Sequence, residues 1–357
     1  MRFFPNLFDR TKQNPQTSYR HHVAHHGPNQ KYKIIHQALV IPNLPAPIRY
    51  LNFSSLIGKP NLPIFQNTSL TKQQAANTAS VIASISPHMT GHSNHYAVLE
   101  ECFFSEQSFY YSDREKIDGK LPHIHLHRHD PELSFDMDIQ STHQISYFKR
   151  MQLGLYEHWS LLVRCRGQLS YQNQIYEINH LGSYEYARTV KLPYFPISFL
   201  VYQVINLENG CQLLLLQLRD RFNHILQSRL YLRDINLDHS QCFDQNVQFF
   251  IYRVFPCVKT PHGKSMYLLR EFEWRSQNVD GAQISILGTC RGDYKFGLGE
   301  GYVGSFDYEI YINNQDEKGE GGYIQYIDCR GLKYQELDET ERKENNLFNF
   351  DLISCKK

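Results

Sequence analysis

The chain has 357 residues, of which 41% are hydrophobic and 20% are charged. This composition suits one large or two ordinary globular domains, and it excludes a disordered, collagenous or coiled-coil chain. The net charge is +1, and the Lys and Arg residues form no basic run, so we expect no nucleic-acid partner.

Residues 1–79 are rich in proline, as in IPNLPAPIRYLNF (41–53) and IGKPNLPIF (57–65). Proline fixes φ and lacks a backbone donor, so it disfavours helices and central strands. We therefore expect residues 1–79 to form an extended, turn-rich N-terminal arm that packs on the body of the protein. Within this arm, TKQQAANTAS (71–80) is the one segment that could form a short helix.

From residue 80 onward the sequence predicts β-structure. Apolar and polar residues alternate strictly in SFDMDIQ (134–140) and in SFDYEIYI (305–312), which is typical of half-buried antiparallel strands. Aromatic residues make up 13% of the chain, with 24 Tyr and 22 Phe, and they also favour strands. Roughly sixteen candidate strands between residues 80 and 335 indicate an all-β barrel or sandwich.

Two blocks of the sequence look like an internal repeat. LGSYEY (181–186) matches VGSFDY (303–308) with conservative changes only, and Cys-Arg-Gly precedes each block, at 165–167 and 290–292. We infer two related β domains, 80–191 and 198–357. LPYFP (192–196), with its two prolines, is a natural linker between them.

These blocks also carry a family resemblance. The pattern G-x-L-x-Y-x-x-Q-x-Y-x-I-x-x-LGSYEYAR (167–188) resembles the end of the first domain of double-lipocalin proteins. This group includes carotenoid 1,2-hydratases, AttH-like proteins, tocopherol cyclases and fungal decalin-forming cyclases. GTCRGDYKFGLGEGYVGSFDYE (288–309) resembles their C-terminal Gly-x-Gly-Tyr-Val strand. An uncharacterised bacterial family is more similar still, and shares IPNLPAPIRYLN (41–52), NTASVIASIS (77–86) and LGSYEYAR (181–188).

The resemblance implies an all-β fold of two lipocalin-like (calycin) antiparallel β-barrels with an apolar pocket in or between them. Hydratase-type relatives carry an Asp-His pair followed by Gly-x-Arg where this chain has Ser183-Tyr184-Glu185-Tyr186-Ala187-Arg188. Glu185 and Arg188 match the acid and the Arg of that pattern, whereas the His and the Gly are missing. The resemblance therefore implies ligand binding more directly than hydratase chemistry.

Acidic, basic and phenolic residues gather near this motif. A carboxylic acid, an imidazole and a phenol beside an apolar cavity could protonate a polyene or orient a polar head group. The alternative is an interdomain Glu185–Arg188 ion pair, with Trp159 in the core. The candidate catalytic residues are Glu185, His158 and Tyr184. The candidate ligand-binding residues are Tyr156, Trp159, Tyr186, Arg188, Tyr302 and Asp307.

Histidines form a second candidate site. A two-residue turn at Pro131-Glu132 would pair His127 with Asp136 and His125 with Asp138, and period 2 would place the histidines on one strand face. Neutral imidazoles beside carboxylates could bind Zn²⁺. The alternative is a solvated face of His–Asp cross-strand pairs. The candidate ligands are His123, His125, His127 and His129, and His88, His92 and His95 could add another.

The function that we expect is the binding of a small hydrophobic ligand such as a fatty acid, an isoprenoid or a polyene. The alternatives are a lyase or isomerase that uses acid catalysis, and metal-dependent chemistry at the His hairpin. We expect no cofactor apart from the possible zinc ion, and the oligomeric state stays open. No apolar run is long enough to cross a bilayer.

Several of the eight cysteines lie in apolar runs, and no C-x-x-C pair occurs. This pattern indicates buried free thiols and a reducing compartment. The first twelve residues, MRFFPNLFDRTK, lack the apolar core of a signal peptide. We therefore expect a cytoplasmic protein.

Overall fold

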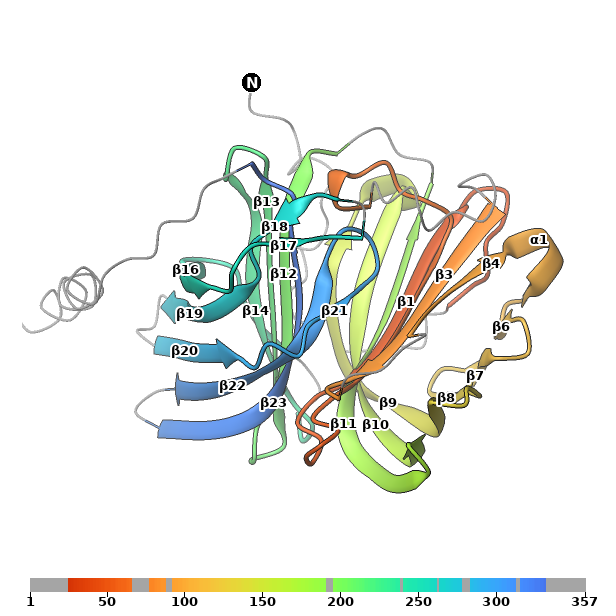
Figure 1. Cartoon of the computed structure of the whole chain (residues 1–357), viewed down its shortest axis with the longest axis horizontal. Helices are drawn as coiled ribbons and strands as arrows, with labels where there is room; N and C mark the ends of the chain where they lie inside the picture. Colours follow the sequence, from red (N-terminus) through yellow and green to blue (C-terminus); the bar gives the residue numbers. More distant parts are fainter. Residues whose placement is uncertain are drawn as a thin grey trace, which may run out of the picture.

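Two large antiparallel β-sheets lie side by side in a computed structural model of the chain (Figure 1). The structure describes residues 25–65, 77–87, 92–190, 195–237, 240–261, 263–277, 283–312 and 315–331. The all-β prediction is confirmed. None of the few short helices in these described segments could span a membrane.

The first sheet has eleven strands in the order β4-β3-β2-β1-β11-β10-β9-β8-β7-β6-β5. Between β4 and β5 the chain forms the single-turn helix α1 (Val98–Glu101), and the short 3₁₀ turns η2 (Pro63–Phe65) and η4 (Gln152–Gly154) follow β2 and β9. The strands are β1 (Ile34–Ile41), β2 (Leu51–Ile57), β3 (Thr78–Ile85), β4 (Ser93–Ala97), β5 (Cys102–Phe104), β6 (Ser108–Tyr111), β7 (Glu115–Lys120), β8 (His123–Arg128), β9 (Leu133–Arg150), β10 (Tyr156–Tyr171) and β11 (Gln174–Thr189).

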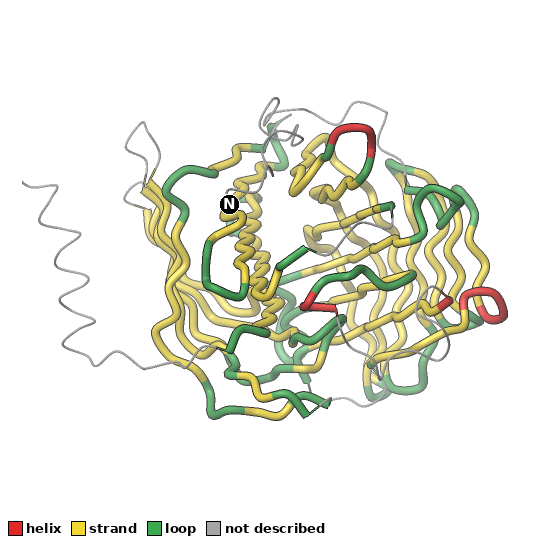
Figure 2. The backbone as a smooth tube through the Cα atoms, turned by 90° about the horizontal axis from the view of Figure 1, so that it is seen from above, coloured by secondary structure: helices red, strands yellow, loops and turns green. Residues whose placement is uncertain are grey.

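The first sheet curls into a nearly closed barrel (Figure 2), and side chains connect its edge strand β4 to β7 and β8. Glu115 on β7 accepts hydrogen bonds from Asn94 (2.9 Å) and Tyr96 (2.5 Å), both on the edge strand β4. The same carboxylate forms a fully buried ion pair with Arg128 on β8. A buried charge is tolerated only when it is paired and hydrogen-bonded, so this cluster ties β4 to the opposite wall.

The second sheet has ten strands and forms a half-barrel, in the order β15-β14-β13-β12-β23-β22-β20-β19-β16, with β21 paired to β22. β17 (Val258–Lys259) and β18 (Ser265–Met266) pair separately. The strands are β12 (Ile197–Asn206), β13 (Cys211–Asp220), β14 (Ile225–Asp234), β15 (Gln241–Phe243), β16 (Gln248–Val254), β19 (Leu269–Gln277), β20 (Gln283–Cys290), β21 (Lys295–Phe296), β22 (Tyr302–Ile312) and β23 (Gln315–Asp328).

The two sheets share one topology. Each begins with a four-strand meander whose first strand also pairs with the last strand of the sheet, β1 with β11 and β12 with β23. The apparent repeat does not mark equivalent positions, however. Residues 181–186 lie on β11, the last strand of the first sheet, whereas residues 303–308 lie on β22, the last strand but one of the second sheet. The two domains are related by topology and not through this match.

The N-terminal segment differs from the expected arm. Residues 34–57 provide β1 and β2, and β3 begins at Thr78, so the first sheet contains part of the segment 1–79. Pro42, Pro45 and Pro47 fall between β1 and β2, and Pro60 and Pro63 fall between β2 and β3, which leaves each apolar run free to pair. The C-terminal end of the expected helix 71–80 is strand, and residues 71–76 lie outside the described part. Residues 191–194, with most of the expected linker, also lie outside it.

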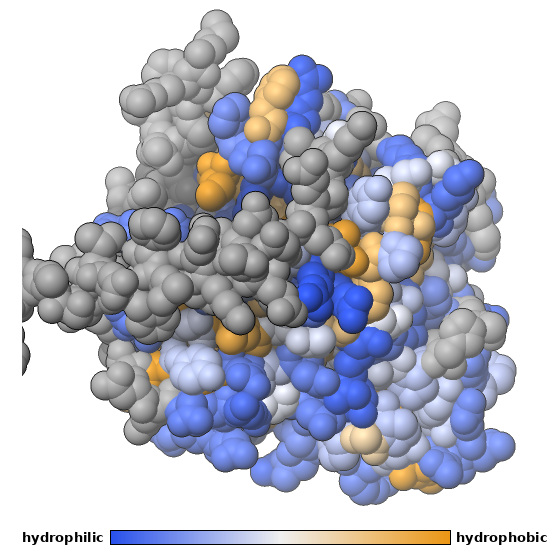
Figure 3. Space-filling view, turned by 60° about the vertical axis from the view of Figure 1, so that its left-hand side comes forward, coloured by the Kyte–Doolittle hydropathy of each residue, from blue (hydrophilic) through white to orange (hydrophobic). Residues whose placement is uncertain are grey.

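The three larger apolar clusters of the described residues result from the period-2 pattern of the strands. One fills the inner face of the first barrel and one fills that of the second. Each contains one of the two Trp residues, Trp159 and Trp274. The third cluster lies where outer faces of the two sheets meet, and we call this contact the seam; it includes Val40, Phe148, Tyr202, Leu214, Tyr231 and Tyr323. The described surface in Figure 3 is mainly hydrophilic, with small separate hydrophobic patches.

Candidate functional site

The candidate residues near the end of the first domain divide between two faces of the barrel wall. Neighbouring residues of a strand point to opposite faces. Tyr184, Tyr186 and Trp159 therefore belong to the core inside the first barrel, whereas Glu185 and His158 point outward to the seam. The structure brings Glu185 and His158 together and separates Tyr184 from them.

Inside the first barrel, aromatic rings surround a few polar groups. The Trp159 ring lies 5.3 Å from that of Tyr186 and 6.3 Å from that of Tyr184, measured between centroids. The Tyr184 hydroxyl accepts a hydrogen bond from Gln37 Nε2 (3.4 Å). Burial raises the pKa of Tyr184 well above its usual value and that of Tyr186 to about 12, so both phenols stay neutral at physiological pH.

Further polar groups of this interior escaped the sequence analysis. Tyr111 donates a hydrogen bond to Ser55 Oγ (2.9 Å), and Gln37 is fully buried. A signal for Gln37 does exist, because it is the one amide in the apolar run IIHQALVI. Its position in that run places it on the same face as Ile35 and Leu39.

At the seam, a buried chain of hydrogen bonds crosses from one sheet to the other. Tyr202 on β12 donates a hydrogen bond to Glu185 on β11 and lies 3.3 Å from the Ser183 hydroxyl. Ser183 is linked to Ser160 (2.7 Å), which accepts a hydrogen bond from Arg233 Nη1 (2.8 Å). Arg233 also donates to Gln212. We call these residues the seam cluster: Ser160, Ser183, Glu185, Tyr202, Gln212 and Arg233.

His158 lies at the edge of the seam cluster. Its Nε2 atom is 3.5 Å from Glu185 Oε2, and its Nδ1 atom is 3.2 Å from the Tyr156 hydroxyl. Its ring meets that of Phe148 edge-on at 4.5 Å. Burial, and then the neighbouring His158, lower the pKa of His36, whose ring lies 6.1 Å away. An imidazole beside a buried carboxylate can hold or move a proton, so acid–base chemistry is possible here.

Arg188 does not pair with Glu185. Its guanidinium binds Glu157 (2.8 Å) and lies over the Tyr32 ring, 4.7 Å from the centroid. The alternative of a Glu185–Arg188 ion pair is therefore wrong: Glu185 faces the seam, and Arg188 is held beside Glu157. Trp159 is in the core, as the alternative interpretation had it.

Tyr302 and Asp307 lie on β22 in the second sheet. Tyr302 packs in the second core, 5.3 Å from the Phe296 ring, and Asp307 accepts a hydrogen bond from Arg291 (2.7 Å) at the surface. These contacts lie within the second domain. Asp307 takes the place of Glu185 in the apparent repeat, but β22 is not the counterpart of β11.

The His hairpin has the expected register. His127 pairs with Asp136, His125 with Asp138, Leu126 with Met137 and Ile124 with Ile139. The turn is longer than two residues, because β8 ends at Arg128 and β9 begins at Leu133. His129 consequently lies beyond the strand, and His123 is exposed at its start.

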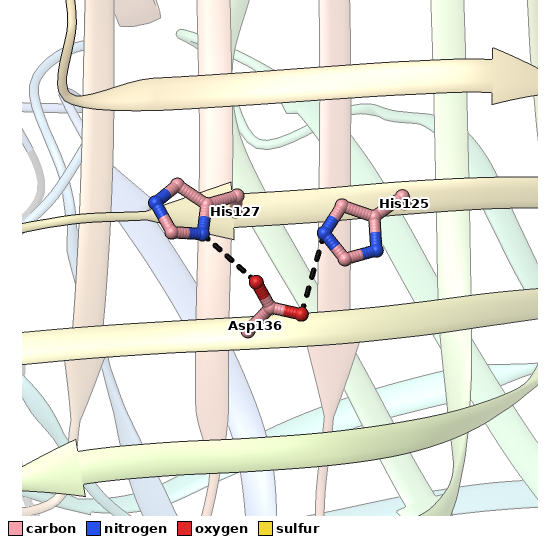
Figure 4. A group of neighbouring side chains, drawn as sticks. All are labelled: His125, His127 and Asp136. Carbon is pink, nitrogen blue, oxygen red and sulfur yellow. Dashed lines mark hydrogen bonds and ion pairs between the residues drawn. The ribbon is translucent and has the colours of Figure 1, made fainter.

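Three side chains of this hairpin converge: His125, His127 and Asp136 place one ligand atom each within 4.8 Å of the others (Figure 4). His92 and His95 do not join this group. His92 Nε2 donates to the carbonyl of Phe296 (2.8 Å), and His95 bonds to Ser80 (3.0 Å). His88 lies outside the described residues.

Solved structures show the same architecture. A protein assigned as AttH from Nitrosomonas europaea has a TM-score of 0.60 and 11% identity, covering 87% of this chain and 99% of its own. Kievitone hydratase from Nectria haematococca has a TM-score of 0.54 and 10% identity, with 83% and 89% covered. CghA has a TM-score of 0.51 and 9% identity, with 85% and 90% covered. The resemblance to AttH-like double-lipocalin proteins is thereby confirmed for the fold.

Sequence comparison leads to a family and not to an activity. No curated protein sequence matches the chain. The model of a family of unknown function, DUF6670, matches residues 54–344, which is most of the chain. The chain belongs to the DUF6670 family.

Proposed function

We propose that the protein binds a small hydrophobic ligand, such as a fatty acid, an isoprenoid or a polyene, inside the first barrel. The observation that carries this proposal is the first sheet itself, which has eleven strands and an apolar, aromatic inner face. About eight strands already enclose an interior that side chains just fill or that holds one small ligand, and the diameter grows with strand number.

The polar groups of this interior favour a ligand with one polar end. The Gln37–Tyr184 and Tyr111–Ser55 pairs lie among otherwise apolar side chains. Ligand sites typically combine an apolar lining with a few such groups, which orient the bound molecule. The Tyr184 phenol stays neutral and accepts a hydrogen bond from Gln37, so its own proton can be donated to a hydroxyl, carbonyl or carboxylate oxygen of the ligand. The hydratase among the structural relatives supports a small organic ligand in this fold.

The two Trp residues permit a direct test, because they report on different barrels. Trp274→Phe leaves only Trp159, in the first barrel, and Trp159→Phe leaves only Trp274, in the second. A bromine-labelled fatty acid quenches Trp emission at short range. We expect saturable quenching of the Trp274→Phe variant and little quenching of the Trp159→Phe variant.

The two variants are matched controls for each other. Quenching confined to Trp274 would move the site to the second barrel and overturn the proposal. Absence of quenching in both variants, together with no bound lipid in native mass spectrometry of the fresh protein, would overturn ligand binding altogether.

A second candidate function is a lyase or isomerase that acts by acid catalysis on a hydrophobic ligand bound between the two barrels, at the seam, and not inside the first barrel. The observation that favours it is the 3.5 Å approach of His158 to Glu185 in a buried setting. Turnover of a conjugated polyene would be followed through its absorbance. Glu185→Gln should abolish turnover, whereas Glu157→Gln, which changes a carboxylate outside the seam cluster, should leave most of it. Equal rates in both variants would remove the support for catalysis at Glu185.

We also propose that the protein works in a reducing compartment such as the cytoplasm. Seven cysteines of the described residues are free thiols. Burial raises the pKa of Cys165 and Cys290 well above its usual value, which keeps them as unreactive thiols. Thiol titration of the denatured protein, purified without reductant, should find all eight cysteines free. A disulfide would contradict this placement.

A further inference from the structure

We propose that His125, His127 and Asp136 form a binding site for a divalent transition-metal ion of the zinc class. The site lies on the outer face of the β8–β9 hairpin and is separate from the barrel interior. Ile124 and Leu126, which alternate with these histidines, point inward into the core. This inference is therefore independent of the ligand proposed for the first barrel.

The candidate donor atoms lie near the spacing of a metal site, since one atom from each residue lies within 4.8 Å of the others. Asp136 lies on the neighbouring strand, between the two imidazoles (Figure 4). Its carboxylate oxygens are 3.3 Å from His125 Nε2 and 3.0 Å from His127 Nδ1. A tetrahedral Zn²⁺ ion with ligand distances near 2.1 Å places its ligands about 3.4 Å apart. Small side-chain rotations are thus sufficient to admit the ion in place of the protons.

A further carboxylate orients one of the ligands. His125 Nδ1 lies 3.1 Å from Asp138 Oδ1, and an ionised carboxylate only accepts hydrogen bonds, so Nδ1 carries the proton of this contact. Once a metal ion has displaced the proton between Nε2 and Asp136, the lone pair of Nε2 is available to bind that ion. A carboxylate behind a metal-binding histidine is the usual arrangement, because it sets the tautomer and the ring orientation.

The backbone beneath the site is held firmly. Ile124, Leu126, Met137 and Ile139 are at most 3% exposed, and a slip of one residue would expose all of them. The metal-facing side chains stand on the opposite face, with His125 and His127 41% and 37% exposed. Three protein ligands on a rigid surface leave the remaining coordination positions to water, as in an open zinc site.

At the positions that pair directly with His125, His127 and Asp138, the charges favour a cation over an anion. By register, Asp118 and Lys116 of β7 lie beside His125 and His127, and Arg166 of β10 lies beside Asp138. With neutral imidazoles, the carboxylates of Asp118, Asp136 and Asp138 outnumber the two basic groups. The ammonium group of Lys116 is drawn toward the Tyr110 ring, 5.6 Å from its centroid.

The test is calorimetric titration of the full chain with Zn²⁺ after chelator treatment and buffer exchange, and with Co²⁺ for the visible spectrum of its complex. We expect one ion per chain. Loss of a carboxylate behind a ligand costs about 10- to 100-fold in metal affinity, so Asp138→Asn should weaken binding by this factor. Replacing a ligand, as in His125→Ala or His127→Gln, should weaken it further.

Two controls make the outcome decisive. His123→Ala changes a histidine of the same strand that is outside the group, and it should leave the affinity unchanged. His21→Ala/His22→Ala removes imidazoles of the N-terminal segment and should also have no effect. Three outcomes would each overturn the site. The first is unchanged affinity in His125→Ala and His127→Gln, with a native circular dichroism spectrum. The others are loss of binding in His21→Ala/His22→Ala and absence of binding by the wild-type chain.

Discussion

At the residue scale, one step along a strand decides the role of a side chain. Tyr184 and Glu185 are neighbours on β11, yet Tyr184 lies inside the first barrel and Glu185 lies at the seam. Glu185 is 5% exposed and accepts the Tyr202 hydroxyl. Because a buried carboxylate is costly when it lacks hydrogen bonds, Tyr202 matters for the stability of the seam.

We predict that Tyr202→Phe lowers the free energy of unfolding by about 1–3 kcal/mol, because it leaves the buried carboxylate of Glu185 without this donor. Denaturant titration measures the change. Tyr311→Phe is a matched control, since Tyr311 makes its own 3.4 Å contact with a carboxylate, that of Glu309, at the surface. Tyr311→Phe should change the free energy of unfolding by no more than about 0.5 kcal/mol. A Tyr202→Phe protein as stable as the control would contradict the assignment.

Buried imidazoles should make stability depend on pH. Burial lowers the pKa of His25 to about 4, from an ordinary value of 6.5. Between pH 4 and pH 6.5, His25 therefore binds a proton more readily in the unfolded chain than in the folded one. The contribution of His25 to stability is complete above pH 6.5 and is lost as the pH falls toward 4, by up to about 3 kcal/mol.

His25→Phe should accordingly flatten the decline of stability between pH 6.5 and 4 while keeping ring packing against Phe109. The decline should not vanish, because burial lowers the pKa of His36 and His92 as well. Denaturant titration at several pH values provides the measurement. A profile with an unchanged slope would show that His25 titrates normally in the folded state.

At the element scale, glycines let the strands of the second barrel accommodate large aromatic rings. Gly288 on β20 lies opposite Phe272 on β19, and Gly322 on β23 lies opposite Phe306 on β22. A Cβ at either glycine would overlap the ring across from it. Each ring thus lies over the glycine backbone, which is a known way to stabilise glycine in a sheet.

We predict that Gly288→Ala destabilises the protein by about 1–3 kcal/mol, the usual cost of overpacking a core. Gly331→Ala is the control, because a Cβ at Gly331 would meet no atom of the described residues within 4 Å. Thermal unfolding should show a lower midpoint for Gly288→Ala alone. If Gly288→Ala unfolds at the wild-type temperature, the Phe272 ring has room to move and the close packing is refuted.

At the scale of the whole molecule, the seam couples the two barrels. Its apolar cluster is supplemented by hydrogen bonds that cross between the sheets, including Tyr231 to the carbonyl of Tyr147 (2.7 Å) and Arg229 to that of Phe148 (2.9 Å). Such a contact should make the domains unfold together, since separating them exposes apolar surface and buried polar groups at once.

This coupling can be measured with the single-Trp variants. We predict coincident unfolding transitions for Trp159 and Trp274 in otherwise wild-type protein. Leu214→Ala removes a seam contact and should separate the two transitions. Leu215→Ala changes the next residue of β13, which faces the second core, and should shift both transitions together. Each substitution should lower the free energy of unfolding by about 2–5 kcal/mol. Separate transitions in the wild type would show that the seam does not couple the barrels.

The sequence by itself determined the local structure wherever a binary pattern was strong. The alternation of the β8–β9 hairpin decides which residues face inward, because a slip of one residue would place Ile124 and Met137 in water. Tyr184 and Glu185 are also neighbours on a strand, so the same alternation predicts that they point to opposite faces of the sheet. Proline content, by contrast, concealed β1 and β2, because it marks the turns around strands as well as arms.

Only the tertiary structure decided which distant residues meet. The seam cluster joins Ser160 and Glu185 to Tyr202 and Arg233, and no spacing along the chain encodes these contacts. They depend on how two complete sheets pack, since burial at the seam exists only after both barrels have formed. The sequence therefore determined the strands, their faces and the kind of fold, whereas the packing of the two sheets decided which polar groups became buried neighbours.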